Sequence, residues 1–100
     1  MYHLHIYGPL EGNVDVEVTF PDGRRFAATF FTLKNIQELM THHASTGECL
    51  NGLYFWASDM VIIQDITETN IRKAIEDMIS TGEFERVFKR LEQNQERDLN

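Results

Sequence analysis

The chain lacks the features that mark secreted, membrane-spanning and nucleic-acid-binding proteins. It has one cysteine in 100 residues, so an internal disulfide is impossible and a cytoplasmic location is expected. No apolar run approaches the roughly 18 residues of a membrane span, and no signal peptide opens the chain. Lys and Arg number nine against 16 Asp and Glu, a net charge of −7. This acidity argues against binding to nucleic acids or to anionic membranes.

Basic residues are missing altogether from the middle of the chain, residues 35–71. This segment also holds the only cysteine, the only tryptophan and two of the four histidines. Its charged residues are all acidic: Glu38, Glu48, Asp59, Asp65 and Glu68. Since both ends of the chain are nearly balanced in charge, the middle segment is the place to look for a binding surface.

The composition is that of one folded domain. Hydrophobic residues make up 42% of the chain and charged residues 25%, as in ordinary globular proteins. We expect the domain to span residues 1–92 and the polar tail at 93–100 to fray.

Alternating apolar and polar residues predict a β-hairpin. One strand runs over residues 13–20 and the other over 24–31, joined by a turn at Pro21-Asp22-Gly23. The register places Glu17 diagonal to Arg25 on the outer face. It also gives three apolar pairs: Val18 with Phe26, Val16 with Ala28 and Val14 with Phe30.

Three further strands are expected. Residues 2–7 alternate, with Tyr2, Leu4 and Ile6 facing inward. The aromatic run 53–57 and the apolar run 60–64 are separated by a turn-like Ser-Asp pair, and we expect them to form a central hairpin of the sheet.

Helical spacing accounts for the remaining apolar residues. Thr32 is the expected N-cap of a helix over residues 33–44, and Thr67 caps a second helix with a stripe from Ile71 to Ile79. A capping box at Ser80 and Glu83 predicts a third helix that continues to Leu91. The buried stripe expected of the first helix comprises Leu33, Ile36, Leu39, Met40 and His43. The order β-β-β-α-β-β-α-α indicates an α+β fold: a single antiparallel sheet of four to five strands with helices packed on one face.

The segment 52–60 is the most distinctive in the chain. As a strand it would project Tyr54 and Trp56 on the face opposite Leu53, Phe55 and Ala57. An exposed Tyr/Trp pair flanked by acid is typical of a protein-binding hot spot. The alternative, which the sequence favours, is that both faces are covered, one by helices and the other by a partner subunit or the N-terminal strand. The candidate binding residues are Tyr54, Trp56, Asp59, Glu48 and His43.

Evidence for metal sites or catalysis is weak. His3 and His5 share one face of a strand but have only Asp15 and Glu17 as neighbours, so a solvated face is expected. Consecutive His42 and His43 point about 100° apart on a helix and do not suit one metal ion. Cys49 has no local motif that would activate its thiol, and no nucleotide-binding or CxxC pattern is present. We expect no cofactor and no catalytic residue.

Three functions fit the sequence. The leading one is a small acidic protein-interaction domain without catalytic activity, of the inhibitor or immunity type, that binds a basic protein partner. The second is a homodimeric structural domain. The third is a small enzyme or ligand-binding domain with a pocket beside residues 53–57 that uses Asp59, His43 or Cys49.

Overall fold

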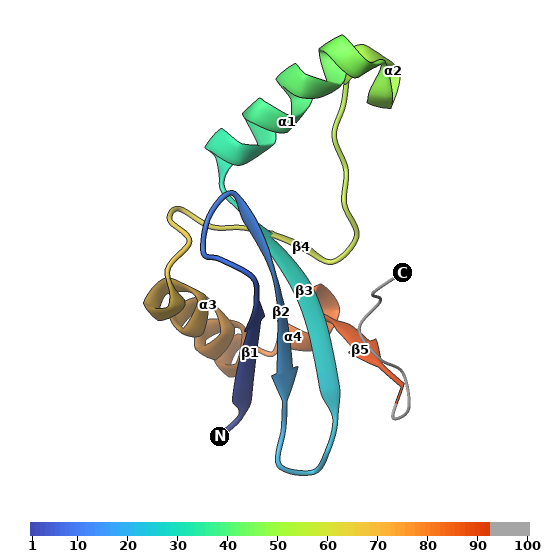
Figure 1. The fold of residues 1–100 in the computed structure, drawn as a ribbon. Coiled ribbons are helices and arrows are strands. Elements are labelled where there is room, and N and C mark those ends of the chain that lie inside the picture. Colours follow the sequence, from blue (N-terminus) through green and yellow to red (C-terminus); the bar gives the residue numbers. More distant parts are fainter. Residues whose placement is uncertain (93–100) are drawn as a thin grey trace.

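The fold is built on one five-stranded sheet (Figure 1). A computed structural model of the protein describes residues 1–92, and the tail expected to fray at 93–100 lies outside them. Strands β1, β2 and β3 follow one another across the sheet, and both β4 and β5 pair with the far edge of β3. The strands are β1 (His3–Tyr7), β2 (Asn13–Thr19), β3 (Arg25–Phe31), β4 (Met60–Ile62) and β5 (Lys89–Leu91). The α+β class with a single sheet of this size is confirmed.

The hairpin of β2 and β3 has the predicted register. Val18 lies opposite Phe26, and the other two apolar pairs also form. Arg25 Nε is 3.2 Å from Glu17 Oε1 on the outer face, as the diagonal placement predicted. The first strand is confirmed as well, and β1 runs antiparallel to β2.

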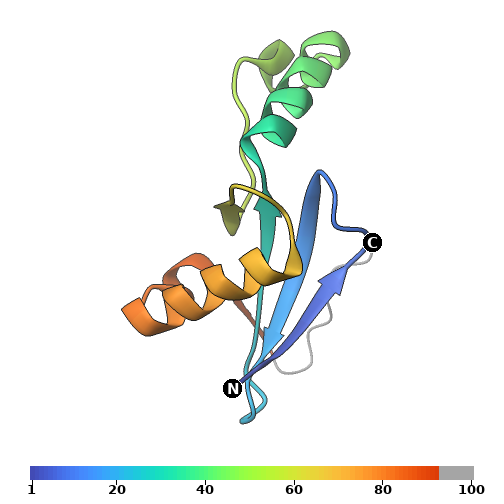
Figure 2. The same ribbon diagram turned by 90° about the vertical axis from the view of Figure 1, so that its left-hand side faces the viewer.

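The core lies between the inner face of this sheet and two helices, α3 (Glu68–Thr81) and α4 (Phe84–Val87) (Figure 2). Thr67 caps α3 by accepting a hydrogen bond from the Asn70 N–H. The helix inserts Ile71 and Ile75 into the core. The strands contribute their inward residues, including Val14, Val16, Val18, Phe26 and Phe30. Burial of these apolar side chains is the main stabilising term of the fold.

The third helix is shorter than predicted. It ends at Val87, and Phe88 is already extended (φ −85°, ψ 142°), so residues 89–91 form β5. The predicted capping box is absent, because the Ser80 hydroxyl donates to the Asp77 carbonyl instead. β5 pairs with Arg25–Ala27 of β3 and so supplies hydrogen-bond partners to the backbone of that edge. A helix over residues 89–91 could not do so, because its backbone groups would bond within the helix.

The predicted central hairpin of 53–57 and 60–64 is wrong. Residues 53–59 form no strand, and β4 is only three residues long and pairs parallel to β3 at Thr29–Phe31. This parallel pair is the exception in an otherwise antiparallel sheet. The aromatic run has no free strand beside it, because the preceding helices carry the chain away from the sheet.

Those helices are α1 (Leu33–Thr46) and α2 (Glu48–Gly52). Thr32 caps α1 as predicted, accepting from the Asn35 N–H, and the helix runs two residues further than expected. Figures 1 and 2 show α1 and α2 projecting beyond the end of the sheet, followed by a chain segment that returns to β4. We call residues 33–59 the arm.

Candidate functional site

The arm presents an amphipathic helix that residues 1–92 cover only in part. None of the residues of α1 is buried, although its apolar side chains recur at helical spacing. The prediction of a buried stripe is therefore wrong: Leu33 is 69% exposed, and the other four residues of the stripe are half-buried. A helix normally buries such a stripe against its own domain, whereas residues 1–92 leave part of this one exposed.

Two aromatic contacts hold the returning segment 53–59 of the arm against α1 and the end of β3. The Phe55 ring stacks on His43 of α1 at 6.3 Å between centroids and meets Phe31 at the end of β3 edge-to-face at 5.4 Å. His43 Nε2 is also 3.7 Å from Glu48 Oε1, whereas its Nδ1 is buried without a hydrogen-bond partner among residues 1–92. The inner side of the arm is thus a small aromatic cluster around Phe55.

The tip of the arm is a strained left-handed turn. Cys49, Leu50 and Asn51 have φ values of 51°, 52° and 59°, and Gly52 follows at 80°. Left-handed backbone costs L-residues roughly 1–2 kcal/mol each, and three in a row are rare. Strain of this kind clusters at functional sites, where surrounding contacts must maintain it.

The close approach of Gly52 to α1 helps to maintain this turn. A Cβ atom on it would lie 2.3 Å from the Met40 carbonyl oxygen and 3.1 Å from the Ala44 nitrogen. The turn therefore lies directly against the backbone of α1, at a distance that no other residue type permits.

All five predicted site residues lie in the arm, but they do not converge on one point. Tyr54 is 47% exposed and Trp56 68% exposed, so neither the helices nor the N-terminal strand covers them. His43 and Glu48 are neighbours, as described above. Asp59 is half-buried in a left-handed conformation (φ 52°), and its carbonyl oxygen accepts a hydrogen bond from the Thr29 N–H. Its role in the fold is to turn the chain into β4.

The other chemical candidates remain dispersed. His3 and His5 are exposed on β1, where the His5 ring contacts Tyr7 at 4.2 Å. The rings of His42 and His43 are 6.4 Å apart. Cys49 is half-buried in the left-handed turn. Within residues 1–92, no group of three or more His, Cys, Asp or Glu side chains is placed to hold a metal ion.

The sequence does not predict a further feature of the arm, a groove on α1. It is a shallow, open depression of about 460 Å³, lined by Leu33, Ile36, Gln37, Met40, Thr41, Ala44 and Gly52. The sequence signal for the groove is the helical spacing of Leu33, Ile36 and Met40, but this spacing predicts a face buried against the sheet. Local periodicity shows that a helix has an apolar side but not what that side contacts.

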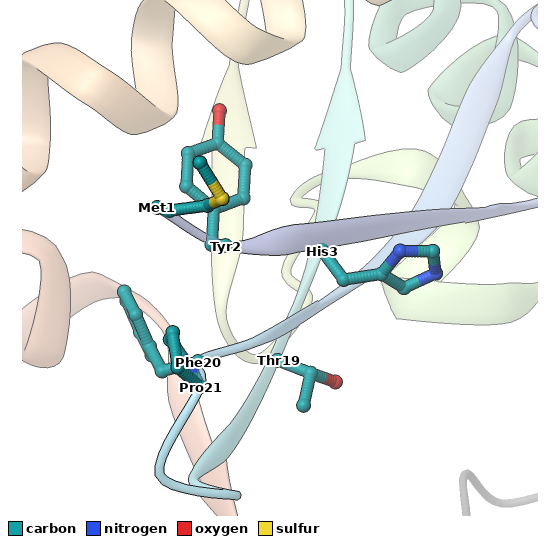
Figure 3. A pocket seen from close by; sticks show the side chains of 6 residues that line it. All are labelled: Met1, Tyr2, His3, Thr19, Phe20 and Pro21. Carbon is teal, nitrogen blue, oxygen red and sulfur yellow. The ribbon is translucent and has the colours of Figure 1, made fainter.

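A second hollow lies at the other end of the sheet, between the start of β1 and the β2–β3 turn (Figure 3). It encloses about 370 Å³ and is lined by Met1, Tyr2, His3, Thr19, Phe20 and Pro21. Figure 3 shows His3 and Thr19 projecting away from Tyr2 and Phe20. The Tyr2 hydroxyl donates to Glu76 at 3.1 Å, and burial together with that carboxylate raises the pKa of Tyr2. The lining of this hollow is mainly apolar and offers no convergent set of reactive groups.

No helix among residues 1–92 has the length and apolar character needed to cross a membrane. Comparisons with protein-family models, with curated proteins and with solved structures give no match to this chain.

Proposed function

We propose that the protein is a non-catalytic interaction domain, of the inhibitor or immunity type, that presents its arm to a basic protein partner in the cytoplasm. The exposure of Tyr54 and Trp56 on a projecting segment carries the proposal. Large rigid aromatic side chains supply most of the energy of protein interfaces when a partner covers them. The single cysteine supports the cytoplasmic location.

The charge of the arm supports a basic partner. It carries three carboxylates, Glu38, Glu48 and Asp59, and one Lys or Arg residue, Lys34. Basic residues gather at the other end of the sheet, where the β2–β3 turn, β3, α4 and β5 carry Arg24, Arg25, Arg86, Lys89 and Arg90. Acid around an aromatic anchor steers a basic protein toward it and raises the association rate. The groove on α1 supports recognition over catalysis, since no titratable side chain lines it.

The test is site-specific photo-crosslinking in extracts of the source cell. A photoreactive phenylalanine analogue replaces Leu53, which is 71% exposed beside the aromatic pair, and a second sample carries it at exposed Lys73 on α3. We expect the position-53 probe to capture one basic protein, with a yield that falls as salt is raised. An acidic captured protein, or equal capture from position 73, contradicts the proposal.

Binding of the captured protein is then measured with two variants. Tyr54→Ala/Trp56→Ala should weaken it by about 30-fold, the effect of losing about 2 kcal/mol at a hot spot. Ile79→Ala, which removes an exposed apolar side chain from α3, should leave the affinity unchanged. Equal affinities for the two variants contradict the assignment of the arm.

A further inference from the structure

The groove on α1 differs from the aromatic surface because it carries no charge. None of its lining residues is ionisable. At 100° per residue, Glu38 points about 140° away from Leu33, and Lys34 lies beside Thr41 at the edge of the groove. Two copies of a chain with a net charge of −7 repel one another. Close contact between them is least costly where the touching surfaces are uncharged, as these are.

The two ends of the groove have complementary shapes. Leu33 at one end is 69% exposed and stands out from the surface. Ala44 and Gly52 at the other end are small, and Gly52 lies flat against the backbone of α1. Eleven residues of helix separate Leu33 from Ala44, about 16 Å. A second α1 that runs antiparallel therefore places each Leu33 over the small residues of the other copy.

We propose that the α1 groove binds the α1 groove of a second copy of this chain, antiparallel and about a two-fold axis. Such an interface is isologous, because both copies use the same surface and every contact occurs twice. A parallel pair instead sets Leu33 against Leu33 and the small residues against each other. Because the arm projects beyond the sheet (Figures 1 and 2), the antiparallel pair keeps the two sheets at opposite ends.

The available area predicts a weak dimer. The 14 residues of α1 form a rod about 21 Å long and about 10 Å wide. Leu50, two residues before Gly52 in sequence, is 68% exposed and adds apolar surface at the small-residue end. The apolar surface available for burial is roughly 400 Å² per copy, against about 800 Å² in a standard interface. We therefore expect reversible association with a Kd in the micromolar range.

The first experiment is sedimentation equilibrium of the whole protein. The unmodified chain should show a monomer–dimer equilibrium, and Leu33→Glu should raise its Kd at least tenfold by placing two carboxylates in the interface. Since Leu33 is exposed in the single chain, the variant should keep its circular dichroism spectrum. Ile79→Glu, which puts the same charge on an exposed apolar position of α3, is the control and should dimerise normally. A strictly monomeric unmodified chain, or unimpaired dimerisation of Leu33→Glu, overturns the proposal.

The second experiment tests the antiparallel arrangement by disulfide trapping in a Cys49→Ser background. Leu33→Cys and Ala44→Cys are made as separate chains and oxidised alone or mixed. Since a disulfide requires Cα atoms within about 7 Å, the mixture should give a covalent dimer and neither chain alone should do so. Efficient crosslinking of Leu33→Cys alone indicates a parallel pair and overturns the arrangement.

The dimer and the proposed function can fail separately. Tyr54 and Trp56 do not line the α1 groove. The Tyr54→Ala/Trp56→Ala variant should therefore dimerise like the unmodified chain while losing the basic partner. Leu33→Glu should show the reverse behaviour. If each of these two variants loses both dimerisation and binding of the basic partner, the two surfaces are not separate and the proposed dimer is contradicted.

Discussion

At the scale of single residues, glycine at position 52 determines whether the arm folds onto itself. Its φ of 80° and its contact with the Met40 carbonyl oxygen are separate constraints. Gly82 has nearly the same φ, 81°, but a Cβ atom there would meet nothing within 4 Å. Substitution of Gly82 therefore measures the cost of the left-handed backbone alone, and substitution of Gly52 measures that cost together with the steric clash.

We predict that Gly82→Ala lowers the free energy of unfolding by about 1–2 kcal/mol, the cost of a left-handed alanine, and leaves the fold unchanged. Gly52→Ala should instead move α2 away from α1, because a Cβ atom cannot stand 2.3 Å from a carbonyl oxygen. Nuclear Overhauser effects between the His43 and Phe55 rings report this movement. Their persistence in Gly52→Ala contradicts the prediction.

A second residue-scale prediction concerns acid stability. Asp22 in the β2–β3 turn accepts a hydrogen bond from the Arg24 N–H and lies 2.7 Å from the guanidinium Nε, and these contacts lower its pKa. A lowered folded-state pKa stabilises the fold above the pKa of the unfolded chain, and this contribution is lost as the pH falls through the folded value. Asp22→Asn keeps an acceptor oxygen but not the charge. Its stability should therefore decline less between neutral and acidic pH in urea titrations, and an unchanged pH profile contradicts this role.

At the scale of elements, local signals predicted much of the structure. The register of β2 and β3 followed from the alternation of Val14 to Phe20, and both capping threonines are where the sequence indicated. The failures concern partners that lie far away in sequence. Residues 53–57 have the composition of a strand but lie on the arm and form no strand, and β4 and β5 depend on the edge of β3 that each can reach.

The same limit explains the candidate site. The aromatic pair and its acidic neighbours were predicted from composition, and all of them lie on the arm. The α1 groove was not predicted, because α1 and α3 have similar apolar spacing. Of these two helices, α3 alone reaches the core, through Ile71 and Ile75, and no local pattern distinguishes it from α1.

The two capping threonines test this difference between the helices. Thr67→Ala should lower the free energy of global unfolding by about 1 kcal/mol, because α3 is part of the core. Thr32→Ala should leave global unfolding nearly unchanged and weaken only α1, which contributes no buried residue. Urea unfolding followed on the amide signals of β2 measures the loss of global stability. The same titration followed on the amide signals of α1 measures the weakening of that helix. Equal losses of global stability contradict an independent arm.

At the scale of the whole molecule, stability should be uneven. The core holds the fully buried side chains, whereas the arm relies on Phe55, His43 and the close contact of Gly52. In hydrogen exchange on monomeric Leu33→Glu, we expect α1 amides to open with a free energy well below that of β2 amides. Equal protection of α1 and β2 contradicts this division.

The pairing of β3 with β4 has a practical consequence. Thr29 lies opposite Met60 and Phe31 opposite Ile62, so the chain leaves and re-enters the sheet on neighbouring strands, about 4.8 Å apart. The sheet itself therefore closes the loop, and each doubling of loop length adds only about 0.6 kcal/mol of closure entropy. We therefore expect that another recognition element can replace residues 33–58, provided that Asp59 is kept to turn the chain into β4.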